Sequence, residues 1–174
     1  MDKRTTLRDY QTNILARLEN AKKAGAESPA GYLGVVIGGK NVLINLQEIS
    51  ETLSMIDIQR VPLVKPWFLG VANVRGVLYA INDLGQMLEN TLTTLSSDTR
   101  LVMVSEAVTS NVAFVVSKMF GLRKLDEMQV RKEAVDDSVC LKTQSYNDTE
   151  NLIWHILDCD KLVRSKEFTT PYEI

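Results

Sequence analysis

The strongest constraint on the fold lies in residues 61–84, where two prolines precede a long apolar run with one cation, Arg75, between Asn73 and Gly76. Proline removes a backbone N–H, so Pro62 and Pro66 interrupt any regular strand before that run. Asn73-Val74-Arg75-Gly76 predicts a turn, because glycine takes positive φ angles at little cost. Residues 77–81 are aliphatic, which predicts that the turn leads into a buried strand.

The rest of the chain predicts short strands joined by glycine or polar turns. Residues 32–37 and 41–46 flank Gly38-Gly39, a pair that favours the turn of a β-hairpin. A second hairpin is predicted from two apolar runs, residues 101–104 and 112–116, and residues 56–61 alternate as a half-buried strand should. Further strands are expected at residues 138–143 and 152–157. Residues 48–55 fit either a strand or a short irregular segment, and residues 121–129 fit either a strand or a helix.

Helices are predicted near the two ends of the chain. Residues 5–24 place Leu7, Tyr10, Ile14, Leu15 and Leu18 on one face of a helical repeat. We expect this amphipathic helix to pack on its own domain, although its basic polar face leaves a membrane or partner role as an alternative. Residues 158–165 predict a closing helix with Asp158 as cap and Leu162 and Val163 turned inward, followed by a loose tail after Lys166.

Asp83 is expected to have a structural role. It precedes a helical turn in which Gln86 is the third residue, so each side chain could hydrogen bond to the other's backbone as in a capping box. After this turn, residues 89–98 are polar apart from Leu92 and Leu95, which predicts a surface loop.

Composition excludes several classes of partner. Twenty Lys and Arg against 22 Asp and Glu give a net charge of −2, so no global field attracts nucleic acid or an anionic membrane. No apolar run approaches the roughly 20 residues that cross a bilayer, and the N-terminal residues lack the apolar h-region of a signal peptide, so we expect a cytoplasmic protein without direct membrane insertion. Cys140 and Cys159 lack metal-site spacing and are expected to be reduced, buried thiols.

Catalytic and cofactor motifs are missing from the sequence. The single histidine, His155, lies in a predicted strand, and no Gly-x-Ser-x-Gly elbow accompanies it. Gly38-Gly39-Lys40 lacks the following Ser or Thr of a P-loop, and acidic pairs such as Asp136-Asp137 are typical of solvated loops. We therefore predict no cofactor, no metal and no enzymatic activity, which leaves recognition of another protein as the expected function.

Short strands and glycine turns indicate an all-β barrel or sandwich with a few helices. Two blocks carry a family resemblance: residues 42–49, ending in Glu48-Ile49, and Gly70-Val71-Ala72-Asn73-Val74-Arg75-Gly76 with Asp83-Leu84 after it. Over residues 30–164 the chain resembles CheW-like coupling proteins, the adaptors of bacterial chemosensory arrays. The resemblance implies two small SH3-like five-stranded β-barrels around a common hydrophobic core. Residues 1–29 would form a helical extension, residues 165–174 a tail, and residues 89–98 a soft boundary between barrels.

The resemblance also implies the function and the site. CheW-like proteins hold the cytoplasmic tip of a chemoreceptor and the regulatory domain of a CheA-like histidine kinase in one complex. Residues matching Glu48 and Arg75 lie close together on the receptor surface in that family, and the matching segments add Leu46, Ile49, Val71, Asn73 and Gly76. Alternatively, Glu48 and Arg75 pair only with each other and pin the turn. Exposed apolar residues at the barrel ends would meet the kinase.

A narrower resemblance is to the PilI-like branch, which serves the type IV pilus system of twitching motility. The N-terminal helix, residues 120–125 and Trp154 carry it. Two departures from the family pattern leave the partner open: Ala80 and Asn82 replace a stretch that commonly holds proline, and Val116-Ser117-Lys118-Met119 replaces Val-Asp-x-Val. The rival interpretation is a small β-barrel that binds a ligand or a nucleic acid.

Overall fold

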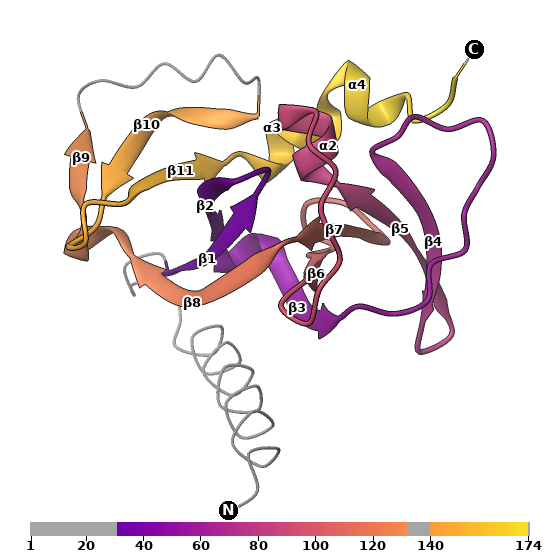
Figure 1. The fold of residues 1–174 in the computed structure, drawn as a ribbon, viewed down its shortest axis with the longest axis horizontal. Helices are drawn as coiled ribbons and strands as arrows, with labels where there is room; N and C mark the ends of the chain where they lie inside the picture. Colours follow the sequence, from indigo (N-terminus) through magenta and orange to yellow (C-terminus); the bar gives the residue numbers. More distant parts are fainter. Residues whose placement is uncertain (1–30, 132–139, 174) are drawn as a thin grey trace, which may run out of the picture.

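The computed structural model describes residues 31–131 and 140–173, which form two β-sheets with short helices between them (Figure 1). One sheet has six strands in the order β8-β1-β2-β11-β10-β9, and the other has five in the order β3-β6-β7-β5-β4. The mainly-β prediction is confirmed, although the expected five strands per sheet hold for only one of the two. The helix predicted over residues 5–24 lies outside the described residues.

The strands of the six-stranded sheet come from both ends of the chain. They are β1 (Gly31–Ile37), β2 (Lys40–Asn45), β8 (Lys118–Lys124), β9 (Gln129–Arg131), β10 (Leu141–Asn147) and β11 (Ile153–Leu157). The five-stranded sheet comes from the middle: β3 (Ile49–Ser54), β4 (Phe68–Val74), β5 (Val77–Asp83), β6 (Arg100–Val104) and β7 (Val112–Val116). The helical segments are η1 (Leu46–Glu48), α2 (Leu84–Glu89), η2 (Leu125–Glu127), α3 (Cys159–Arg164) and α4 (Lys166–Thr169).

The two predicted hairpins are confirmed, because β1 pairs antiparallel with β2 and β6 pairs antiparallel with β7. The turn predicted at residues 73–76 is also present and closes a further hairpin, β4 with β5. Gly38 and Gly39 join β1 to β2 with φ angles of 56° and 80°. Arg75 and Gly76 join β4 to β5 with φ angles of 53° and 87°. Two successive positive φ angles give the turn twist that matches paired strands. At the second turn the Gly76 N–H also donates to Asn73 Oδ1 at 2.8 Å, which compensates for placing a non-glycine residue in the left-handed region.

The chain passes from one sheet to the other at η1, between β2 and β3, and again at Ser117, between β7 and β8. Each sheet also contains a parallel pair, β11 with β2 and β5 with β7, so neither is a simple meander. The loop after α2 joins β5 to β6 within the five-stranded sheet. The loop predicted at residues 89–98 is present from residue 90, after the end of α2, but the chain does not change sheets there.

One hydrophobic core lies between the sheets. Its buried members include Val35 and Ile44 from the six-stranded sheet, Val102 and Phe114 from the five-stranded sheet, and Leu162 from α3. A second cluster lies inside the five-stranded sheet, and a third surrounds Trp154 at the opposite end. The closing helix and its inward residues are as predicted, since Leu162 is buried and Val163 packs against the core.

Three local predictions are corrected. Residues 56–61 do not form a strand: only Gln59 pairs, through two backbone bonds of 2.8 and 2.9 Å to Val71. The strand after Arg75-Gly76 is buried only in its second half: Val77 and Leu78 pair with β4 but lie before the first residue that pairs with β7, and both are exposed. The tail after Lys166 is ordered as α4 and then an extended segment paired with Val64.

Candidate partner-binding surfaces

Arg75 projects from the β4–β5 turn, and its side chain is 70% exposed. Its Nη1 and Nη2 atoms donate to Glu51 Oε1 and Oε2 on β3, at 2.7 and 2.8 Å. β3 and β4 are the first and last strands of their sheet, so this fork-to-fork pair joins its two edges and shows that the sheet curls. The guanidinium is thereby held in one orientation at the surface, as a recognition residue should be.

Glu48, at the end of η1, is half-buried and faces α3. Burial raises the pKa of its carboxyl above the ordinary value, while a hydrogen bond from the Cys159 thiol and the charge of Lys142 act in the opposite direction. Its Oε2 atom is buried and has no hydrogen-bond partner among the described residues. The predicted alternative, an ion pair between Glu48 and Arg75, is wrong, because Arg75 pairs with Glu51. Glu51 follows Glu48 by three residues and lies on β3, and three residues span about 10 Å at the usual rise of a strand.

The structure separates the remaining predicted site residues into two groups. Leu46 and Ile49 are 7% and 2% exposed and belong to the shared core. Burial gives these two side chains a packing role, in place of the direct partner contact that the resemblance implied. Asn73 and Gly76 are exposed at the Arg75 turn, whereas Val71 lies in the middle of β4, paired with Ala80 and bonded to Gln59.

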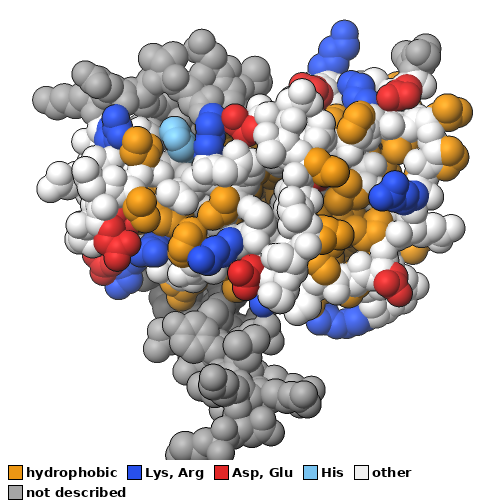
Figure 2. All heavy atoms as spheres, viewed as in Figure 1, with side chains coloured by type: hydrophobic (Ala, Val, Ile, Leu, Met, Phe, Trp, Pro, Cys, Tyr) orange, Lys and Arg blue, Asp and Glu red, His pale blue; other side chains and the backbone are white. Residues whose placement is uncertain are grey.

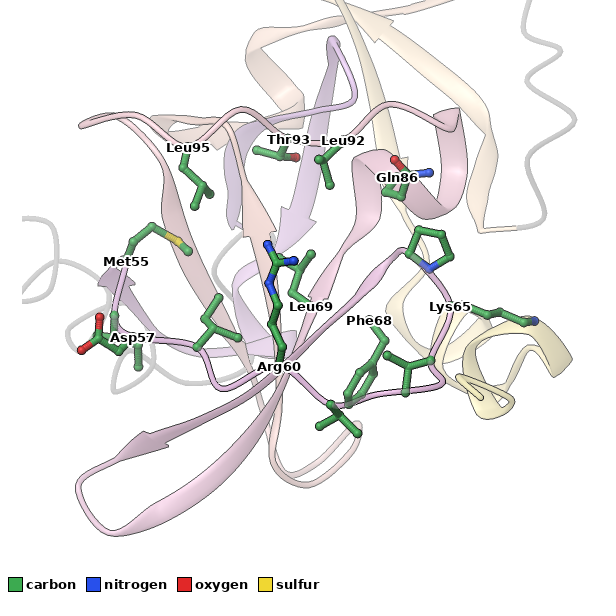
Figure 3. A pocket seen from close by; sticks show the side chains of 15 residues that line it. Met55, Asp57, Arg60, Lys65, Phe68, Leu69, Gln86, Leu92, Thr93 and Leu95 are labelled. Atoms are coloured by element: carbon green, nitrogen blue, oxygen red, sulfur yellow. The ribbon is translucent and has the colours of Figure 1, made fainter. Parts of the chain in front are cut away.

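An apolar groove of about 660 Å³ opens on the five-stranded half of the molecule, between residues 55–69 and residues 92–95 (Figure 3). Leu92 and Leu95 on one bank are 61% and 60% exposed, and Leu63 beside the other bank is 77% exposed. Figure 2 shows hydrophobic side chains gathered on this half of the face. The sequence analysis did not find the groove, although the two leucines that interrupt the polar loop were its signal.

Asp83 fixes the leucine bank of the groove. Its carboxylate accepts from Gln86 N at 3.2 Å, as the predicted cap requires, and also from Thr93 N and Thr93 Oγ1 at 2.7 Å each. The reciprocal bond of a capping box is not made, because Gln86 Nε2 donates to Asn90 Oδ1 instead. One buried carboxylate therefore holds both the start of α2 and the loop that carries Leu92 and Leu95.

The charged residues of the groove are mainly cations. Arg60 and Lys65 line it, with Asp57 as the one acidic residue among its walls. Within residues 31–131 and 140–173, neither cation forms an ion pair. An apolar surface flanked by free cations suits a partner that offers apolar side chains with carboxylates beside them.

A second apolar area lies on the six-stranded sheet. On β8, Phe120 and Leu122 are exposed between Lys118 and Lys124, and the Lys118 ammonium lies 5.0 Å from the Phe120 ring centre. Phe120 also meets the buried Trp154 edge to face at 5.7 Å. The two sheets thus each present exposed apolar side chains.

The described residues offer no candidate metal site. No group of three His, Cys, Asp or Glu side chains in this part of the chain could hold a metal ion. Burial raises the pKa values of both Cys140 and Cys159, so these thiols stay protonated at neutral pH and are poor nucleophiles. No described helix has the length and apolar character needed to cross a bilayer.

Comparison with known proteins relates this arrangement to one family. The family model described as CheW-like domain matches residues 31–167. Protein PilI of Pseudomonas aeruginosa is 33% identical over 115 residues, which cover 66% of this chain and 64% of PilI. Chemotaxis protein CheW of Bacillus subtilis is 22% identical over 130 residues, covering 74% and 83% of the two chains.

A solved structure supports the fold. The scaffolding protein TtCheW from Thermoanaerobacter tengcongensis superposes with a TM-score of 0.66 at 12% identity, over 80% of this chain and 96% of that one. This chain spans less than two thirds of PilI's length.

Proposed function

Because the chain belongs to the CheW-like family, we propose that it is a non-catalytic adaptor that binds a chemoreceptor tip and the regulatory domain of a CheA-like histidine kinase at the same time. Simultaneous occupation of two faces would raise the effective concentration of kinase at the receptor and bias its conformation. The complex would form in the cytoplasm at membrane-associated receptors. The observation that carries the proposal is the presence of two separate, chemically different surfaces on one small domain.

The receptor side is the surface around Arg75. Its guanidinium is exposed, held by Glu51 on a tight turn, and flanked by the exposed Asn73 and Gly76. A fixed, planar donor needs little further ordering when it binds a carboxylate, which limits the entropy lost on association. Glu48, at the end of η1 and three residues before Glu51, is the second residue that we assign to this side.

The kinase side is the apolar groove on the five-stranded sheet. Its exposed leucines, Leu92 and Leu95, provide the apolar area that dominates protein association, and Arg60 and Lys65 provide charge selectivity. The exposed area on β8 would extend contact to the other half of the domain.

The pilus assignment rests on the similarity to PilI, which at 33% identity exceeds that to the chemotaxis protein CheW at 22%. We propose that the receptor and kinase served by this adaptor belong to the chemosensory system that controls twitching by type IV pili. A test is whether loss of the gene abolishes twitching and leaves flagellar chemotaxis unchanged.

Titration calorimetry with one substitution on each face tests the assignment of surfaces. Arg75→Glu should weaken binding of the receptor tip and preserve binding of the kinase regulatory domain, and Leu95→Asp should do the reverse. Both positions are exposed, so circular dichroism should show folded proteins. If each substitution weakens both partners equally, the two-face assignment is wrong. If neither partner binds the folded wild type, the ligand-binding barrel becomes the better interpretation.

A further inference from the structure

The last residues of the chain pack on the five-stranded half of the molecule, beside the segment that leads into β4 (Figure 1). Ser165 caps α4, and its Oγ accepts a hydrogen bond from Phe168 N at 3.2 Å. The Phe168 ring is stacked on Trp67, with ring centres 5.7 Å apart and an interplanar angle of 15°. It also meets Phe114 of β7 edge to face at 6.2 Å. One aromatic side chain therefore anchors this end of the chain.

Beyond α4 the chain pairs with one wall of the groove through two backbone bonds. Lys65 N donates to Pro171 O at 2.7 Å, and Glu173 N donates to Leu63 O at 2.9 Å. Lys65 is itself one of the residues that line the groove. Residues 166–173, which we call the clasp, therefore fix a wall that comes from a distant part of the sequence.

Two features of the closed clasp carry a cost that its release would remove. Leu63 has a φ angle of 59°, which is strained for a residue with a side chain, and that side chain is 77% exposed, so packing does not compensate for the strain. Trp67 is 4% exposed, and its indole N–H is buried with no hydrogen-bond partner among the described residues. Water would satisfy this donor if Phe168 moved away.

The contacts that oppose release are few. α4 is a single turn, Lys166–Thr169, and Tyr172, which forms an isolated bridge with Val64, is 52% exposed. Elements with few buried apolar contacts and exposed backbone bonds open locally while the rest of the protein stays folded. The clasp has both properties, whereas Phe114, on which it packs, is fully buried in the sheet.

We propose that the clasp opens independently of both sheets and thereby switches the groove wall at residues 63–66 between two states. Closed, the wall has the conformation described above; open, Leu63 relaxes, the Lys65 N–H loses its acceptor and Trp67 is uncovered. A partner that binds the closed wall more tightly than the open wall would hold the clasp shut. The switch is a property of this chain alone, and only the identity of such a partner rests on the proposed function.

Hydrogen exchange in the full-length free protein, followed by nuclear magnetic resonance, tests the clasp at three protons. They are the amides of Lys65 and Glu173, which make the two backbone bonds, and the indole N–H of Trp67. Phe168→Ala removes the anchor and should raise the exchange of all three by about tenfold or more, as for an element that opens locally. Unchanged exchange at Lys65 in this variant would overturn the proposal.

Two reference protons separate local opening from a general loss of stability. The Val71 amide donates to Gln59 O at 2.9 Å in a second isolated bridge, and the Trp154 indole donates to an aspartate at 2.8 Å on the other sheet. Both should keep their wild-type exchange rates in Phe168→Ala. A rise at these two protons equal to the rise at Lys65 would overturn the proposal, because the clasp would then not open on its own.

Phe120→Ala is the matched control for loss of an aromatic ring. Phe120 also meets a tryptophan edge to face, but on the six-stranded sheet, where its partner is Trp154. Its removal should leave the exchange of Lys65, Glu173 and the Trp67 indole unchanged. Faster exchange at these three protons would contradict the independence of the clasp.

A second pair of variants leaves the aromatic anchor in place. Glu173→Pro deletes the N–H that bonds to Leu63 O, and Glu173→Ala keeps it. Exchange at Lys65 should rise by about threefold or more in the proline variant only. Equal rates in the two variants would show that the terminal bonds do not hold the wall, which would refute the clasp. Because no partner is present in any of these measurements, their outcome is independent of whether the adaptor assignment holds.

Discussion

Replacing Asp83 tests how the groove is built. The carboxylate is 1% exposed and accepts three hydrogen bonds, one from the start of α2 and two from Thr93. Loss of a helix cap costs about 1 kcal/mol. Each of the two Thr93 bonds contributes about 1 kcal/mol net, and somewhat more with a charged acceptor. Asp83→Ala should therefore lower the free energy of unfolding by about 3 kcal/mol.

Asp158 provides the matched control. It is also a helix N-cap, but its side chain accepts a single backbone bond, from Lys161 N at 3.0 Å, in an exposed setting. Asp158→Ala should cost only about 1 kcal/mol. Urea unfolding followed by circular dichroism at pH 7 measures both values. Equal losses in the two variants would refute the reasoning, since water would then replace the Thr93 bonds at no cost.

Three further predictions concern the turn, the buried carboxyl and the glycines. Arg75→Glu should weaken receptor-tip binding in calorimetry with an unchanged circular dichroism spectrum; loss of the fold would instead make Arg75 structural. Burial raises the pKa of the Glu48 carboxyl above 4.5, so the folded state binds the carboxyl proton more tightly than the unfolded state does. The stability that this tighter proton binding contributes is lost as pH rises through the raised pKa. Glu48→Gln should therefore be more stable than wild type in urea at pH 7 and similar at pH 4; a destabilised variant at pH 7 would contradict this sign. Gly70→Ala would place its Cβ against the Gln59 carbonyl and should cost about 2 kcal/mol or more, against about 1 for Gly76→Ala, where φ is positive but space is open; similar unfolding midpoints would show that the clash relaxes.

The parts of the fold that the sequence predicted correctly depend on local chemistry. Gly38-Gly39 and Asn73-Val74-Arg75-Gly76 can close tight turns whatever surrounds them, so the first hairpin and the turn before β5 could be predicted directly. The caps Asp83 and Asp158 likewise act within three residues of themselves. Such signals need no knowledge of the rest of the chain.

The errors arose where distant residues decide the structure. Residues 56–61 alternate like a strand, but their apolar side chains line a groove and only Gln59 finds a partner strand. The tail has little apolar content of its own, and it is ordered because Phe168 meets Trp67, about a hundred residues earlier in the chain. Local periodicity cannot show either contact.

The candidate site shows the same division. The sequence identified the Arg75 turn, whose geometry is local, but not the partner of its guanidinium, Glu51, which comes from a different strand. One alternative paired Glu48 with Arg75, whereas the acidic partner of Arg75 is Glu51. The groove was missed because its two banks are brought together only by the folded sheet.

Formation of a ternary complex tests the adaptor account most directly. The kinase regulatory domain should be titrated into the protein already saturated with receptor tip, with the molar mass of the product measured by sedimentation. The account predicts saturable binding and a mass equal to one copy of each of the three components. Displacement of the receptor tip by the kinase domain would contradict it, because the two partners would then compete for one surface.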